Sequence, residues 1–142
     1  MLTPRFNPPK EWMGNHNHYV YGFADLMMKL TRMGVRGSAL EIGSYTGDTA
    51  LMLHMFGLFD EIHCVEPFEG KEEFLLRSPP LEWWNVHAEF SLNTRNAPVE
   101  LHKGYSYDIL PNLDKQFDFI YIDGAHDYES VKQDIELALP LL

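Results

Sequence analysis

The chain has 142 residues, of which 45% are hydrophobic and 23% are charged, a composition typical of one soluble globular domain. Its formal net charge of −10 disfavours general binding to nucleic acids or anionic membranes, because phosphates repel an acidic surface. A single cysteine, Cys64, excludes an internal disulfide, and the sequence shows neither a signal peptide nor 18 consecutive apolar residues, so we expect a cytoplasmic protein.

The N-terminal part of the sequence predicts an irregular arm followed by a helix. Residues 1–18 contain three prolines and no apolar periodicity, which is typical of irregular structure. From Tyr19 to Met33 apolar residues recur at helical spacing, and Gly34 follows, so we predict a helix over residues 19–36.

Four short apolar segments predict strands, at Ser38–Ile42, Ile62–Val65, Val99–His102 and Phe117–Ile122. The last is rich in aromatic and β-branched residues, and we expect it to be the most buried strand. Helices are predicted between the strands, over residues 48–56 and about 81–92, and a final helix follows residue 128. Strands that alternate with helices predict an α/β fold with a mainly parallel sheet covered on both faces.

Ligands of such sheets bind beyond the carboxyl ends of the strands, and the first strand end carries a glycine turn. The turn has Gly-x-x-x-Gly spacing and is composed of Glu41, Gly43, Ser44, Tyr45 and Gly47. Glycine lets the backbone turn tightly and approach a ligand closely. The spacing matches neither the dinucleotide fingerprint nor a phosphate-binding P-loop, and a plain strand-to-helix turn explains it equally well.

The second and third strand ends carry an acid and an aromatic residue. Glu66 follows Gly47 by 19 residues, where a carboxylate is suited to hold a ribose diol, although a solvated loop acid is an alternative. Tyr105 and Ser106 could stack on and hydrogen-bond a purine, or could simply start a helix. Together with Glu41, Glu66 favours a positively charged nucleoside such as a sulfonium over a pyrophosphate.

The fourth strand end carries an acid and an imidazole. Asp123 and His126 could take a proton from a substrate hydroxyl or hold a divalent cation, and a structural role for His126 is equally open. Asp127 is placed to cap the final helix.

With these motifs, residues 37–142 resemble the class I S-adenosylmethionine-dependent methyltransferases, most closely the small-molecule O-methyltransferase branch called methyltransferase family 24. The motifs that carry the resemblance are Ala39–Gly47, Val65–Pro67, His102–Ser106 and Asp118–Tyr128. The last is the most specific, because it contains the pattern Asp-Gly-x-His-x-Tyr. The family fold is Rossmann-like, and residues 1–142 would form one such domain.

The resemblance implies a role for each strand end. The loop against the methionine part of S-adenosylmethionine would consist of Gly43, Ser44, Tyr45 and Gly47, with Glu41 near the amino group. Glu66 would hold the ribose diol, whereas Tyr105 and Ser106 would border the adenine.

Asp123 would lie beside the transferable methyl group. In metal-dependent members the equivalent acid helps to bind Mg²⁺ with carboxylates beyond the next strand, so a divalent metal is possible but is not assigned here. The family fold has seven strands and this sequence predicts four, the cofactor-binding half, so we expect a C-terminally truncated domain. Phe117–Ile122 would then be an open sheet edge, through which we expect a homo-oligomer.

The function predicted from the resemblance is methylation of a small-molecule hydroxyl, with Asp123 as the base and His126 as its helper. Trp83, Trp84 and residues 16–19 are candidates for substrate or lid contacts, although the tryptophans fit a core equally well. The main alternative is a non-catalytic fragment that binds S-adenosylmethionine or S-adenosylhomocysteine without a complete substrate pocket. A nicotinamide-dependent oxidoreductase and a metal-dependent hydrolase are more remote alternatives.

Overall fold

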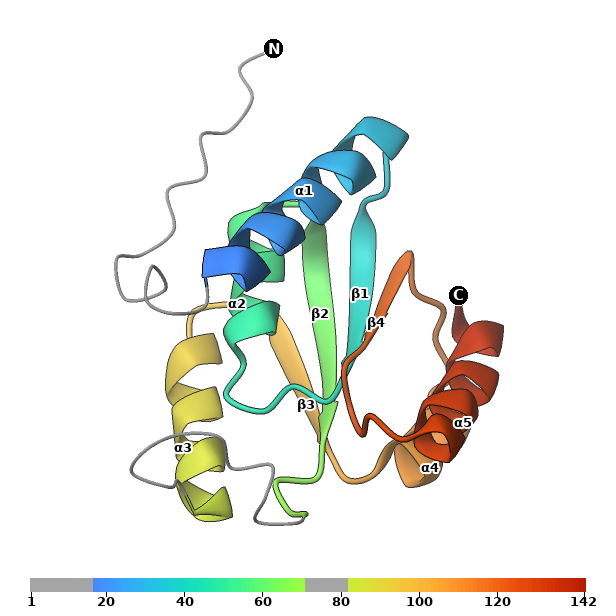
Figure 1. Ribbon diagram of the computed structural model, residues 1–142. Coiled ribbons are helices and arrows are strands. Elements are labelled where there is room, and N and C mark those ends of the chain that lie inside the picture. Colours follow the sequence, from blue (N-terminus) through green and yellow to red (C-terminus); the bar gives the residue numbers. More distant parts are fainter. Residues whose placement is uncertain (1–16, 71–81) are drawn as a thin grey trace.

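A computed structural model describes residues 17–70 and 82–142 of the chain. Its centre is a four-stranded sheet with the order β3-β2-β1-β4, in which every pair of neighbours is parallel (Figure 1). The strands are β1 (Gly37–Ile42), β2 (Phe59–Glu66), β3 (Val99–Lys103) and β4 (Phe119–Ile122). The predicted Rossmann-like α/β fold with a parallel sheet is therefore confirmed.

Helices cover both faces of the sheet (Figure 1). One face is covered by α1 (Asn17–Met33), α2 (Asp48–Met55) and α3 (Trp83–Thr94). The other is covered by α4 (Ser106–Ile109), η3 (Leu110–Asn112), α5 (Tyr128–Ala138) and η4 (Leu139–Leu141). No helix in the described ranges is long and apolar enough to cross a membrane.

The strand residues alternate between two hydrophobic clusters, as the pleat of a strand requires. Ala39 of β1 and Ile62 of β2 are fully buried in the cluster beneath α1, α2 and α3. Leu40 and Val65 point the opposite way, into the cluster beneath α4 and α5. Both central strands are therefore buried on their two faces.

The expectation that the last strand is the most buried is wrong. All four residues of β4 are only half-buried, because among the described strands β4 pairs with β1 alone and lies at the edge of the sheet. Phe117 is buried but precedes the strand, and its N–H donates to the carbonyl of Leu141 over 2.6 Å. Phe117 is therefore buried because it packs beneath η4, and not because it belongs to the strand.

Helix α1 begins two residues earlier and ends three residues earlier than the predicted range of 19–36. Its C-terminal end coincides with Gly34, which has φ 77° and donates its N–H to the Thr31 carbonyl over 3.2 Å. A glycine in this left-handed conformation is a common helix terminator. Residues 1–16 of the predicted arm lie outside the described ranges.

Candidate ligand-binding site

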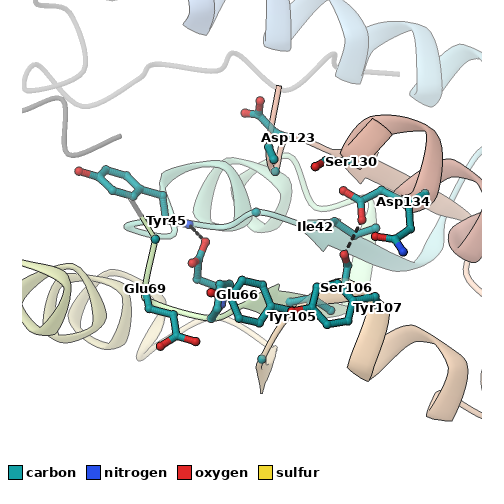
Figure 2. Close-up of a pocket in the computed structure, with 18 of the residues that line it drawn as sticks. Ile42, Tyr45, Glu66, Glu69, Tyr105, Ser106, Tyr107, Asp123, Ser130 and Asp134 are labelled. Carbon is teal, nitrogen blue, oxygen red and sulfur yellow. Dashed lines mark hydrogen bonds between the residues drawn. The ribbon is translucent and has the colours of Figure 1, made fainter. Parts of the chain in front are cut away.

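A pocket of about 460 Å³ lies beyond the carboxyl ends of all four strands (Figure 2). Its walls come from the loops that follow β1, β2, β3 and β4 and from the first two turns of α5. The volume is in the range of small-molecule sites. Of the residues predicted from the sequence, the lining includes Gly43, Tyr45, Glu66, Tyr105, Ser106, Asp123 and His126.

The two glycines of the first turn have different roles. Gly43 has φ 86°, and a Cβ atom there would stand 2.4 Å from the Asp123 carbonyl oxygen, so only glycine lets the β1 and β4 loops approach each other. Gly47 has φ 78° and precedes α2, and a Cβ atom there would stand 2.8 Å from Thr94 Cγ2 on α3. Gly47 therefore serves helix packing and is not part of the pocket lining.

Glu66 is the most firmly positioned acid of the site. Its side chain is buried, and one carboxylate oxygen accepts a hydrogen bond from the backbone N–H of Tyr45 over 2.8 Å (Figure 2). The other oxygen accepts from the backbone N–H of Phe68 over 2.9 Å. Tyr45 adopts φ 46°, a conformation that is uncommon outside glycine. Each carboxylate oxygen keeps a second lone pair, so Glu66 can still accept hydrogen bonds from a ligand.

Glu41 and Ser44 are buried beside the pocket and are not part of its lining. Glu41 is 1% exposed, and the Cys64 thiol donates to its Oε2 over 3.6 Å. Burial raises the pKa of Glu41 to about 8. The charge of Asp123 adds to this rise, whereas hydrogen bonds from Ser44 and Cys64 work against it. The carboxyl group is therefore largely neutral at pH 7.

Asp123 and His126 face the pocket together from the loop after β4. Asp123 Oδ1 lies 3.4 Å from His126 Nε2, and the imidazole is 77% exposed. Burial raises the pKa of Asp123, whereas the neighbouring His126 opposes this rise. The pair can accept a proton and share its charge.

Asp134 on α5 is a buried acid of the pocket wall that was not predicted as a site residue. It accepts a hydrogen bond from the Ser106 hydroxyl, which joins α5 to the loop after β3 (Figure 2). Burial raises the pKa of Asp134, and the charge of Asp127 adds to this rise. The sequence does contain a sign of its burial, because Asp134 shares a helical stripe with Val131 and Ala138 and so belongs to the packed side of α5.

Aromatic side chains form a further wall of the pocket. The rings of Tyr105 and Tyr107 stack with centroids 5.2 Å apart and an interplanar angle of 8°. Burial and the charge of Glu69 raise the pKa of the Tyr105 phenol. Trp84 is 68% exposed and does not line the pocket, while the Trp83 side chain and His16 lie outside the described part of the structure.

The pocket is strongly acidic. Its lining contains the four carboxyl groups of Glu66, Glu69, Asp123 and Asp134, and no lysine or arginine among the residues described. Such a lining favours a ligand that carries positive charge and disfavours phosphates.

Comparison with known structures gives the same fold in O-methyltransferases. The TomG O-methyltransferase of Streptomyces achromogenes, involved in tomaymycin synthesis and solved with S-adenosylmethionine, is 21% identical with a TM-score of 0.56. An O-methyltransferase of Bacillus cereus, solved with S-adenosylhomocysteine, is 25% identical with a TM-score of 0.57. The match covers 82% of this chain in both cases, but only 48% and 49% of those proteins, so the chain spans about half their length.

Comparison by sequence identifies the family. No curated protein sequence matches the chain. The model of a methyltransferase domain family, methyltransferase family 24, matches residues 40–142, which include every strand end that lines the pocket. The match covers well over half of the chain, and the chain therefore belongs to this methyltransferase domain family.

Proposed function

We propose that this chain binds S-adenosylmethionine in the acidic pocket and transfers its methyl group to a hydroxyl of a small molecule. The observation that carries the proposal is the buried carboxylate of Glu66, which two backbone amides hold at the pocket wall. Family membership and the fold shared with two O-methyltransferases support the same function.

The residues around the pocket fit this cofactor. Both hydroxyls of a ribose can donate to the free lone pairs of Glu66. The stacked rings of Tyr105 and Tyr107 offer a flat apolar surface for an adenine base. The Gly43 turn would lie against the methionine part, and the acidic lining would stabilise the positive sulfonium.

When bound, S-adenosylmethionine supplies a methyl group that its sulfonium activates for displacement. The protein then has to align the acceptor oxygen and remove its proton. Asp123 is our candidate for the base, because its carboxyl group faces the pocket and burial raises its pKa, which makes the carboxylate more basic. His126 lies 3.4 Å from Asp123. It would orient the carboxylate and share the positive charge of the proton that Asp123 accepts.

A divalent metal at Asp123 is not part of this proposal. Within residues 17–70 and 82–142, Asp123 does not belong to any cluster of three metal-ligating side chains. We therefore derive no step of the reaction through a metal. The acceptor that we propose is a small hydroxyl compound such as a phenol or a sugar. A cytoplasmic location accords with the buried free thiol of Cys64.

The alternative is a chain that binds the cofactor without catalysis. It is favoured by one observation, that the chain spans about half the length of the O-methyltransferases it matches. Incubation with S-adenosylmethionine and a panel of phenols and sugars distinguishes the two proposals. Acceptor-dependent formation of S-adenosylhomocysteine, reduced at least tenfold in Asp123→Asn, supports catalysis, whereas cofactor binding without turnover supports the alternative.

Calorimetric titration with S-adenosylhomocysteine tests the binding site. We expect micromolar binding, and we expect Glu66→Ala to weaken it at least tenfold, or about 1.4 kcal/mol, because the ribose loses its acceptor. Glu129→Gln removes one exposed negative charge outside the pocket and should bind like the wild type.

Thermal unfolding of each variant shows whether weaker binding reflects a lost contact or a lost fold. A folded wild type that does not bind S-adenosylhomocysteine would refute the proposal. Equal affinity of wild type and folded Glu66→Ala would refute the assignment of Glu66.

A further inference from the structure

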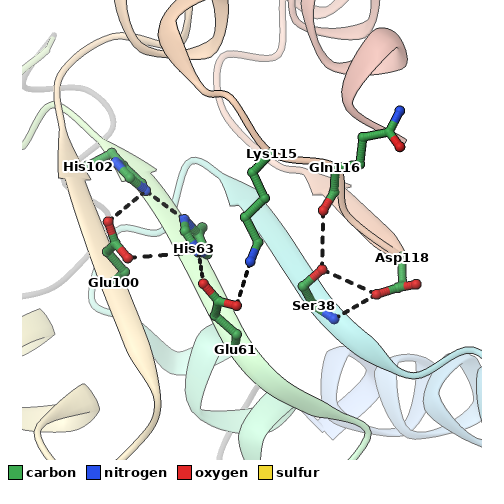
Figure 3. A network of polar contacts seen from close by, with 8 residues as sticks. All are labelled: Ser38, Glu61, His63, Glu100, His102, Lys115, Gln116 and Asp118. Atoms are coloured by element: carbon green, nitrogen blue, oxygen red, sulfur yellow. Dashed lines mark hydrogen bonds and ion pairs between the residues drawn. The ribbon is translucent and has the colours of Figure 1, made fainter.

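A cluster of imidazole and carboxylate groups lies on the sheet face that carries α4 and α5, outside the lining of the pocket (Figure 3). His63 comes from β2, and Glu100 and His102 come from the neighbouring edge strand β3. A ring nitrogen of each histidine and a carboxylate oxygen of Glu100 all lie within 4.8 Å of one another.

The two imidazoles face each other. His63 Nδ1 lies 2.7 Å from His102 Nε2, and the rings stack with centroids 5.0 Å apart. The carboxylate of Glu100 approaches both rings, with Oε1 3.7 Å from His102 Nε2 and Oε2 3.9 Å from His63 Nε2. Glu100 is largely exposed, so its side chain can rotate toward the gap between the rings without disturbing the core.

Glu61 fixes the tautomer of His63. Its Oε1 lies 2.7 Å from His63 Nε2, and its Oε2 is paired with the ammonium of Lys115 (Figure 3). Because Lys115 pairs with the other carboxylate oxygen, Oε1 of Glu61 accepts the Nε2–H of His63. The lone pair of Nδ1 is then directed at His102, in the carboxylate–histidine arrangement that orients metal ligands in proteins.

We propose that His63, His102 and Glu100 form a zinc-binding site that joins β2 to the edge strand β3. Two imidazole nitrogens and one carboxylate oxygen form a ligand set suited to Zn²⁺, whereas Mg²⁺ prefers oxygen ligands alone. The exposed side of the cluster leaves a fourth position for water. The binding involves Nδ1 of His63, because Glu61 occupies Nε2.

Only small movements convert the observed cluster into the metal site. Zinc–nitrogen bonds of about 2.0–2.1 Å place two ligands of a tetrahedral ion about 3.3 Å apart. The rings would therefore separate by about 0.6 Å from their present contact, while Glu100 closes in. In the present contact the single proton of a neutral His102 lies on Nε2 and points at His63 Nδ1; in the metal site this proton would move to His102 Nδ1, which frees Nε2 for the ion.

Titration of the tag-free chain with Zn²⁺, and separately with Co²⁺ as a spectroscopic substitute, tests the proposal. We expect one equivalent of zinc with micromolar or tighter affinity, and an intense visible Co²⁺ absorption typical of four or five ligands. His102→Gln and Glu100→Gln should each weaken zinc binding at least tenfold, about 1.4 kcal/mol, and reduce the Co²⁺ absorption. Neither variant removes a fully buried side chain, and zinc should raise the melting temperature of the wild type more than theirs.

Two control variants locate the ion. His54→Gln removes a histidine on α2, and Asp123→Asn alters the pocket, so both should bind zinc like the wild type. Absence of one-equivalent binding in the wild type overturns the proposal. Unchanged affinity in both His102→Gln and Glu100→Gln, or loss of binding in either control, also overturns it, because the metal would then bind elsewhere.

Discussion

Glu41 and Glu66 lie at the ends of neighbouring strands and are both buried, but their surroundings differ in one decisive respect. Two backbone N–H groups, of Tyr45 and Phe68, donate to the carboxylate oxygens of Glu66 and hold them in place. Glu41 receives no backbone N–H hydrogen bond among those described; its contacts are side chains such as the Cys64 thiol at 3.6 Å and Ser44, and burial raises its pKa to about 8. The same residue type therefore provides a fixed hydrogen-bond acceptor at one strand end and a largely neutral core group at the other.

The environment of Glu41 predicts a specific loss of stability with rising pH. The pKa of Glu41 is about 8 in the folded chain, against 4.5 for a glutamate exposed to water. Between these values the unfolded chain releases the proton and the folded chain retains it, so the free energy of unfolding falls as the pH rises. The Gln variant lacks this group, so Glu41→Gln should gain stability relative to wild type from pH 5 to pH 8, by on the order of 3 kcal/mol.

Urea unfolding of both proteins across this pH range measures the difference. Glu129→Gln is the matched control, because it removes an exposed carboxyl group on α5. A constant difference between wild type and Glu41→Gln at every pH would contradict the prediction.

Among the elements, α5 shows how a single side chain fixes a helix start and, through it, one wall of the pocket. Asp127 has extended backbone angles and accepts hydrogen bonds from Ser130 N–H (3.0 Å) and Ser130 Oγ (2.7 Å). This N-cap was predicted from the sequence and is confirmed. It sets the position of the first helical turns, from which Gln133 and Asp134 line the pocket.

Removal of this cap should destabilise the chain modestly. Asp127→Ala leaves the Ser130 N–H without its acceptor and should cost about 1 kcal/mol in urea unfolding. Asp127→Asn keeps a side-chain oxygen at the same place and should lose much less. Equal losses in the two variants would show that the cap hydrogen bond is not the cause.

The sequence was sufficient to predict most elements and the strand ends of the site, for a physical reason. Carboxyl ends of parallel strands meet at one edge of a sheet, so Glu66 and Asp123 could be placed together without knowing any contact. Asp134 could not be assigned in this way, because its place in the lining depends on how α5 is rotated against β4. The burial of β4 was misjudged because apolar composition does not show that a strand lies at the edge of a sheet.

For the whole molecule, the two edges of the sheet differ in chemistry. The edge strand β3 carries the charged residues Glu100 and Lys103, which discourage pairing with another strand. The opposite edge, β4, has the sequence Phe-Ile-Tyr-Ile without any charge, and within the described chain it pairs with β1 alone. An uncharged, apolar edge strand is a template for pairing with a second copy.

We therefore expect the isolated chain to form a homo-oligomer through β4. Light scattering coupled to size exclusion should give a mass that rises with protein concentration in the micromolar range. Hydrogen exchange locates the contact, since the backbone amides of residues 119–122 should become more protected as the concentration rises. The amides of β3 provide an internal control and should exchange at a rate independent of concentration, because its charges prevent pairing. A monomeric mass throughout, or concentration-dependent protection at β3 instead of β4, would contradict pairing through this edge.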